Sequence, residues 1–152
     1  MQFLPKTLLA AAAFAVLAAA PAFAGAADDA ITARQACMKA NGGAMGAMVP
    51  MIKGEKPFDA KVVADALGKA EAACAGWAGW WGADTQKGDK VETWAKAEIW
   101  TDAAGFEAAG AAYGKGFAAV KAATDDASFK AAFNEFGGSC KGCHEKFRRP
   151  KE

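Results

Sequence analysis

Apolar residues recur every three or four positions in four stretches of residues 25–152, a spacing typical of amphipathic α-helices. The clearest stretch begins near Asp125 or Asp126 and ends before Pro150. Its apolar residues occupy the a and d positions of a heptad and are Phe129, Phe133, Phe136, Cys140, Cys143 and Phe147. Alanine is abundant and β-branched residues are few, which favours helices over strands. We therefore predict four helices and no sheet, in one domain over residues 25–152.

The first predicted helix begins near Asp28 or Asp29, where a carboxylate can cap free backbone N–H groups. Its expected inward positions are Ile31, Arg34 or Gln35, Met38, Met45, Met48 and Ile52. Gly42 and Gly43 weaken this helix, or else they mark a close approach to a flat group. Residues 53–57 are polar, contain Gly54 and Pro57, and therefore form a connection.

The second helix is expected to have Asp59 as its N-cap and to run to about Trp77. Its inward positions are Val62 or Val63, Ala66, Leu67, Ala70 and Cys74. Three tryptophans follow this helix: Trp77, Trp80 and Trp81. We expect them to pack at the end of the bundle core, and we favour this role over direct contact with a cofactor.

Residues 82–97 form the longest irregular connection. The third helix is predicted to start after Trp100, with Thr101 or Asp102 as its cap. Its apolar stripe consists of Phe106, Ala109, Tyr113, Phe117 and Val120.

The N-terminus has the pattern of a secretory signal peptide. Lys6 is the only charge in residues 1–24, an apolar run follows it, and Ala22-Phe23-Ala24 is an A-x-A cleavage signal. A membrane anchor is the alternative, but the apolar run is shorter than the ~20 residues of a spanning helix and contains Pro21. We predict cleavage after Ala24 and export to the periplasm. No later segment is apolar enough to span a membrane.

Charge argues against a nucleic-acid-binding function. The chain contains 18 Lys and Arg residues and 17 Asp and Glu residues, for a formal net charge of +1. Removing Lys6 with the signal peptide brings the charge to zero, and basic residues are matched by acidic ones through most of the chain.

Cys140, Cys143 and His144 form a C-x-x-C-H motif, which is typical of c-type haem attachment. The two thiols add to the haem vinyl groups and the imidazole binds the iron. In a helix, offsets of three and four residues place all three side chains on one face. The alternatives are a zinc site, which would need a further ligand from Cys37 or Cys74, and a thioredoxin-like dithiol, which belongs to a βαβ pattern that is absent here.

His144 is the only histidine in the chain, so a second histidine ligand from the same chain is excluded. The sixth iron position is then empty or filled by water, methionine or a less usual donor such as lysine. For Met45, Met48 and Met51 we prefer an ordinary core role. Met38 is the candidate ligand, because Arg34 lies one turn before it and offers paired donors to a haem propionate. A solvated surface role for Arg34 remains equally open.

Arg148 lies one turn beyond His144, where it would contact the proximal face or a propionate. The alternative, which we favour, is that Lys146, Arg148, Arg149 and Lys151 complement the negative end of the last helix. Weak docking to an acidic redox partner would be a secondary use of this cluster.

Cys37 and Cys74 lie at nearly equal distances from a turn centred near Glu55. If the first two helices are antiparallel, the two thiols are almost level across the pair. In an exported protein we predict a disulfide, with two buried free thiols as the alternative.

The chain resembles the cytochrome c′ class of periplasmic haem proteins. The resemblance covers nearly all of residues 25–152 and is most specific at the C-x-x-C-H-x-x-F-R ending, Cys140 to Arg148. The other matching segments are Ala33-Arg34-Gln35 followed by Met38, residues 53–59, and Ala97-Glu98-Ile99-Trp100. The resemblance implies an antiparallel up-down-up-down four-helix bundle with haem c attached near the C-terminal end of the fourth helix. It also implies His144 on the proximal side, Arg34 near a propionate and, often, a homodimer through the first two helices.

Within that class, the residue at the place of Met38 determines the behaviour of the iron. High-spin members leave the iron five-coordinate and bind small neutral gases such as nitric oxide, whereas a low-spin branch uses a methionine ligand and resembles a plain electron carrier. Residues 38–42 and 54–57 are similar to the low-spin branch, although some five-coordinate members also have methionine at this place. Cys37 and Cys74 are outside the usual pattern, and a bridge between them would stiffen or displace Met38.

We therefore predict a periplasmic c-type cytochrome that carries single electrons to and from periplasmic redox partners, with one haem c, His144 and Met38 as iron ligands, and Arg34 and Arg148 beside the haem. The alternative is a five-coordinate protein that binds nitric oxide or another small neutral gas. We predict no enzymatic turnover, because no second histidine and no nucleophile–base pair accompany the motif.

Overall fold

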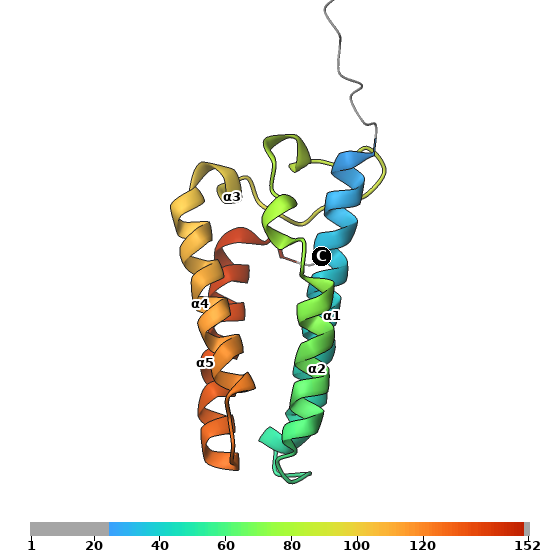
Figure 1. The fold of residues 1–152 in the computed structure, drawn as a ribbon. Helices are drawn as coiled ribbons and strands as arrows, with labels where there is room; N and C mark the ends of the chain where they lie inside the picture. The colour runs from blue at the N-terminus through green and yellow to red at the C-terminus, as the bar shows by residue number, and fades with distance from the viewer. Residues whose placement is uncertain (1–24, 151–152) are drawn as a thin grey trace, which may run out of the picture.

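The structure is a computed structural model that describes residues 25–150, so the predicted signal peptide and Lys151 lie outside the described residues. Its long helices are α1 (Ala26–Ile52), α2 (Ala60–Ala73), α4 (Ala103–Lys121) and α5 (Asp126–Phe147). The shorter elements are α3 (Glu98–Thr101) and the 3-10 turns η1 (Trp77–Gly79) and η2 (Ala83–Thr85). Helix α1 packs on α2 and helix α4 packs on α5, and the long connection crosses between the two pairs at one end (Figure 1). The chain is thus an all-α, antiparallel four-helix bundle, as predicted. None of the helices within residues 25–150 is both long enough and apolar enough to cross a membrane.

Acidic residues cap three of the four long helices where the sequence predicts it. The Asp59 carboxylate accepts hydrogen bonds from the backbone N–H groups of Lys61 and Val62, at 2.9 and 3.1 Å. Asp102 accepts one from Gly105 at 3.0 Å. Asp125 forms a reciprocal capping box with Ser128 at the start of α5.

The first cap was predicted wrongly. Helix α1 begins at Ala26, without a side-chain cap, and the Asp28 carboxylate instead accepts hydrogen bonds from the backbone of Lys90 and Val91. The N–H group of Val91 is the main reason why the pKa of Asp28 is lowered. Asp28 therefore holds the long connection against the start of α1, a tertiary contact that local capping rules do not reveal.

Two helix boundaries also differ from the prediction. Helix α2 ends at Ala73 rather than near Trp77, because the chain turns at Cys74 and the Trp80 indole closes over Gly76. A Cβ atom on Gly76 would lie 2.8 Å from that indole, which shows how tight the turn is. The short helix α3 precedes Asp102, so Trp100 belongs to a helical turn that the sequence did not predict.

The inward face of α1 is rotated relative to the prediction. Its buried residues are Ala30, Ile31, Arg34, Cys37, Asn41, Ala44, Met48 and Met51, whereas Met38 is 37% exposed and Met45 and Ile52 are only partly buried. The helix continues through Gly42 and Gly43, and no protein atom of the described chain lies within 4 Å of a Cβ built on either. Alanine and methionine cover most of this helix, so partner helices decide which face is buried.

The core of the bundle is formed by all four long helices. Fully buried side chains include Met48, Leu67, Val120, Phe129 and Phe136. The Phe129 ring also packs on Phe58, with ring centroids 5.1 Å apart. The core roles predicted for Met48 and Met51 are confirmed, and Met45 packs at the edge of the same cluster.

Gly116 marks the closest approach of α4 to α5. A Cβ atom at this position would lie 2.8 Å from the backbone Cα of Phe136, which cannot rotate away. We expect Gly116→Ala to lower the free energy of unfolding by about 1–3 kcal/mol, the range for overpacked sites. Gly114→Ala is the matched control on the same helix, because its Cβ meets nothing within 4 Å, and it should raise stability by about 0.5–1 kcal/mol. Chemical denaturation measures both, and equal effects of the two variants would contradict the close approach.

Candidate functional site

A pocket of about 630 Å³ lies where α1 and α5 meet the long connection between α2 and α4. This volume is within the range of small-molecule and cofactor sites. The pocket is lined by Ile31, Arg34, Gln35, Met38, Lys39, Trp77, Trp81, Thr93, Trp94, Ala95, Ile99, Phe106, Cys143, His144, Phe147 and Arg148. Five of the six predicted site residues are among them: Arg34, Met38, Cys143, His144 and Arg148.

The C-x-x-C-H motif occupies the last turns of α5. Cys140 and Cys143 are free thiols and both are partly buried. Cys143 and His144 line the pocket, while Cys140 packs against the bundle core one turn earlier. Burial raises the pKa of both thiols, so neither is activated as a free thiolate nucleophile. The motif is helical, as predicted, but only Cys143 and His144 line the pocket, so the predicted common face for all three side chains is not shown.

The His144 imidazole is held toward its neutral form. Partial loss of hydration lowers its pKa, and the nearby positive charge of Arg148 lowers it further. A neutral imidazole has a free nitrogen lone pair and is the form that binds a metal. His144 is therefore suited to be an iron ligand.

Met38 enters the same pocket from α1, on a different helix from His144. Its rotation away from the bundle core leaves its thioether side chain 37% exposed. Trp77 and Trp81 line the same pocket. The pocket therefore holds one imidazole and one thioether on two different helices.

Arg34 is a buried charge whose side chain has spare hydrogen-bonding capacity. It is 5% exposed, and its Nη2 donates to the Thr85 carbonyl at 2.6 Å while its Nε donates to Ala30 at 3.3 Å. Nη1 is buried and lacks a hydrogen-bond partner, and no described carboxylate forms an ion pair with the guanidinium. Burial also lowers the Arg34 pKa. A buried charge without a counterion is costly, so a carboxylate bound in the pocket would complete this site. The expectation that Arg34 is a solvated surface residue is wrong.

This arrangement fits a haem. Arg34 offers a charge-assisted partner for a propionate, Cys143 and Cys140 supply two thiols three residues apart, and His144 supplies an imidazole. Aromatic rings give the pocket an apolar wall suited to a flat macrocycle.

The tryptophans do more than the predicted core plug. Trp77 and Trp81 do pack on Phe106, at centroid distances of 6.1 and 4.8 Å, and on each other at 4.8 Å. The same two residues also line the pocket, and the Trp81 ring lies 4.5 Å from the Arg34 guanidinium carbon. The predicted packing role is therefore confirmed for Trp77 and Trp81, and contact with a cofactor stays a prediction.

Backbone hydrogen bonds that the sequence did not predict hold the segment around Arg148 at the end of α5. Residues 94–96 pair with the end of α5: Lys96 donates to Phe147 at 2.9 Å and Arg149 donates to Trp94 at 2.7 Å. The Arg148 guanidinium carbon lies 5.2 Å from the Trp94 ring. The pairing is between single extended residues, so no strand pattern in the sequence could have revealed it.

Three of the four residues of the predicted basic cluster lie at the C-terminal end of α5, and Lys151 is outside the described residues. Their position agrees with the predicted complement to the helix dipole. These side chains also have specific surroundings: Lys146 pairs with Asp102, Arg149 pairs with Glu92 at 3.4 Å, and Arg148 lines the pocket.

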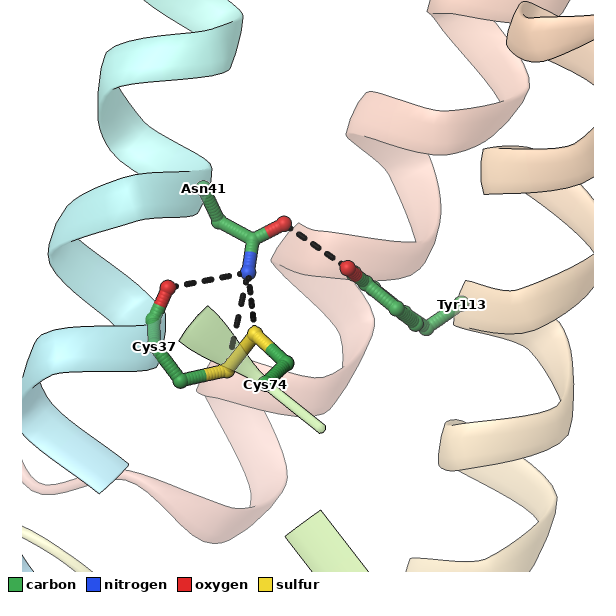
Figure 2. Close-up of a disulfide and its surroundings, with 4 residues drawn as sticks. All are labelled: Cys37, Asn41, Cys74 and Tyr113. Atoms are coloured by element: carbon green, nitrogen blue, oxygen red, sulfur yellow. Dashed lines mark hydrogen bonds between the residues drawn. A yellow bond between two sulfur atoms is a disulfide. The ribbon is translucent and has the colours of Figure 1, made fainter. Parts of the chain in front are cut away.

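Cys37 and Cys74 form the predicted disulfide, with their Cα atoms 4.8 Å apart (Figure 2). The bridge joins α1 to the residue that follows α2. Because Cys37 and Cys74 are bonded to each other, neither thiol is free to bind a metal. A zinc site at Cys140 and Cys143 would need one of them as a further ligand, so the disulfide argues against that alternative.

Comparison with known proteins agrees with this geometry. The family model described as Cytochrome C′ matches residues 29–148. The chain is 41% identical over 124 residues to the cytochrome c′ of Rubrivivax gelatinosus, covering 79% of this chain and 94% of that protein. It is 32% identical over 148 residues to the cytochrome c-556 of Agrobacterium fabrum, covering 96% of this chain and 97% of that protein.

Solved structures show the same likeness. The crystal structure of cytochrome c′ from Rubrivivax gelatinosus matches with a TM-score of 0.72 and 36% identity, over 81% of this chain and 97% of that one. A nitric oxide complex of a mutant of cytochrome c prime from Alcaligenes xylosoxidans matches with a TM-score of 0.71 and 31% identity, over 82% of this chain and 97% of that one.

Proposed function

Because this chain belongs to the cytochrome c′ family, and is therefore a c-type haem protein, we propose that it carries single electrons with one iron bound between His144 and Met38. Cys140 and Cys143 attach the haem c covalently, and Arg34 and Arg148 lie beside it. The observation that carries this proposal is the shared pocket: the chain's only imidazole and the thioether of Met38 enter one cavity from two different helices.

The bound haem supplies an iron that changes between its ferric and ferrous states by one electron. His144 and Met38 are both neutral ligands, and histidine with methionine ligation raises the reduction potential of haem iron. Arg34 provides a buried positive charge for a propionate and is itself held by Thr85. Trp77 and Trp81 contribute apolar rings to the pocket wall.

Gas binding is the second candidate function, and one comparison favours it. Matching structures of cytochrome c prime from Alcaligenes xylosoxidans are nitric oxide complexes. In this alternative, Met38 would line the pocket without binding iron, and the haem would supply an open coordination position for a small neutral gas. The two candidate functions differ in one bond, the bond between the Met38 sulfur and iron.

A Met38→Ala variant tests that bond. We expect the wild-type holoprotein to be low-spin and slow to react with carbon monoxide, and the variant to become high-spin and to react at least ~10-fold faster, because a lost ligand opens one coordination position. Met45→Ala is the matched control, since Met45 lies on α1 but packs at the core cluster. It should leave the spectrum unchanged. A high-spin wild-type protein that Met38→Ala does not alter would give first place to gas binding.

The predicted signal peptide supports a periplasmic location, and the redox partners proposed for the protein are therefore periplasmic. The proposed homodimer through α1 and α2 rests only on the resemblance to the cytochrome c′ class.

A further inference from the structure

The Cys37–Cys74 disulfide belongs to a buried polar chain that connects three helices (Figure 2). Asn41 is the centre of this chain and is 7% exposed. Its Nδ2 donates to the Cys37 carbonyl at 3.0 Å and to the Cys74 sulfur at 3.3 Å. Its Oδ1 accepts a hydrogen bond from the Tyr113 hydroxyl on α4 at 2.8 Å. The amide thus binds α1, the end of α2 and α4 to one another.

This chain matters because few specific bonds connect the two halves of the bundle. Within the described residues, two side-chain hydrogen bonds join α1 and α2 to α4 and α5: Tyr113 to Asn41, and Lys121 to Glu71. The Lys121–Glu71 pair is exposed, so it contributes little. The Tyr113 ring also packs on Phe136 of α5, with centroids 5.3 Å apart. Asn41 therefore links α1 to Tyr113 of α4, whose ring packs on the helix that carries His144.

Met38 lies within the clamped turn of α1. It directly follows Cys37 and precedes Asn41 by three residues, so the disulfide and the Asn41 amide hold the backbone on both sides of it. Cys74 is at the same time three residues before Trp77, which lines the same pocket as Met38. One covalent bond thus restrains two segments that contribute side chains to the pocket.

We propose that Cys37, Cys74, Asn41 and Tyr113 form a thiol-sensitive clamp that sets how closely Met38 approaches the iron. The proposal rests on the function proposed above. When a dithiol reductant opens the disulfide, the turn of α1 around Met38 and the segment that carries Trp77 separate, and small ligands reach the iron more readily.

The exchange chemistry follows from the accessibility of the two sulfurs. Cys37 is 1% exposed and Cys74 is partly exposed, so a reductant thiolate attacks the Cys74 sulfur. The bond between Cys37 and Cys74 breaks, and Cys37 leaves as a thiolate 3.7 Å from the Asn41 Nδ2 donor. The second reductant thiolate then attacks the reductant sulfur of the mixed disulfide and releases Cys74. Two electrons pass from the dithiol, which becomes a disulfide, and its two protons end on Cys37 and Cys74.

The test uses the holoprotein with and without dithiothreitol, with thiol titration to count the released cysteines. We expect two thiols to appear per chain while the haem stays attached, and carbon monoxide to bind the ferrous protein about tenfold faster afterwards. A Cys37→Ala/Cys74→Ala variant should reproduce the faster rate without dithiothreitol. Tyr113→Phe, which removes only the hydroxyl that reaches Asn41, should give an increase of about two- to fivefold.

A matched control separates the clamp from general loosening of the fold. Phe129→Ala removes a fully buried ring in the first turn of α5, far along the helix from His144, and should leave the carbon monoxide rate unchanged. An equal acceleration in Phe129→Ala would overturn the clamp, as would a disulfide that dithiothreitol does not open in the folded holoprotein. The proposed function fails separately if Met38→Ala does not accelerate carbon monoxide binding. If Met38→Ala does so but opening the disulfide does not, only the clamp is overturned.

Discussion

A variant with Cys140→Ala and Cys143→Ala is expected to lose all covalently attached haem. Both thiols lie in the last turns of α5, next to the only imidazole of the chain, and each thioether bond needs one of them. The expected result is a complete loss of haem staining on a denaturing gel, because nothing else would hold haem to the unfolded chain. The variant should also yield a colourless protein after extraction with acidified organic solvent.

The other two cysteines provide the control for this experiment. Cys37→Ala/Cys74→Ala also removes two thiols, but these form a disulfide outside the pocket lining, so the denatured variant should keep its haem. Haem that stays covalently bound after loss of Cys140 and Cys143 would show that the attachment site has been misassigned.

Loss of the disulfide is expected to have the largest effect on stability. The bridge closes a loop between residues 37 positions apart, and a loop of this length stabilises the folded state by about 4 kcal/mol in the chain-entropy relation. We therefore expect Cys37→Ala/Cys74→Ala to lower the free energy of unfolding of the holoprotein by about 3–4 kcal/mol. Equilibrium denaturation in guanidinium chloride measures this loss.

Glu107→Ala is a suitable control for that measurement. Glu107 is an exposed residue on α4, away from the proposed dimer helices, so its truncation should change the free energy of unfolding by less than about 0.5 kcal/mol. A disulfide-free variant that is destabilised by no more than Glu107→Ala would mean that the bridge adds little to the fold.

Local sequence rules predicted the parts of this structure that depend on near neighbours along the chain. The caps at Asp59, Asp102 and Asp125 are set by side chains that reach backbone N–H groups two or three residues away. The heptad of α5 shows its inward face because large phenylalanines alternate with polar residues. The helical state of the C-x-x-C-H motif was predictable for the same reason, whereas the packing of Cys140 toward the bundle core was not. The disulfide was also predictable, since two antiparallel helices joined by a short turn bring Cys37 and Cys74 level.

The features that the sequence did not reveal depend on distant segments. Asp28 is a residue type that often caps helices, but its carboxylate accepts a hydrogen bond from the distant backbone N–H of Val91 instead. The face of α1 could not be read from its own residues, because alanine and methionine are distributed around most of its circumference. Residues 94–96 pair with the end of α5 through backbone hydrogen bonds. Every residue has these backbone groups, so the pattern of side chains could not predict the pairing.

The rotation of α1 has a direct bearing on function. It turns Cys37 and Asn41 into the bundle, and this leaves Met38 free to face the pocket that contains His144. The difference from the predicted stripe therefore places Met38 in the pocket lining, where the proposed ligation requires it.

The absorption spectrum of the ferric wild-type holoprotein tests the central claim most directly. We predict a low-spin spectrum with a sulfur-to-iron charge-transfer band that is present in Met45→Ala and absent in Met38→Ala. A high-spin ferric spectrum without that band would contradict ligation by Met38, and the pocket would then be an open site for a small neutral gas.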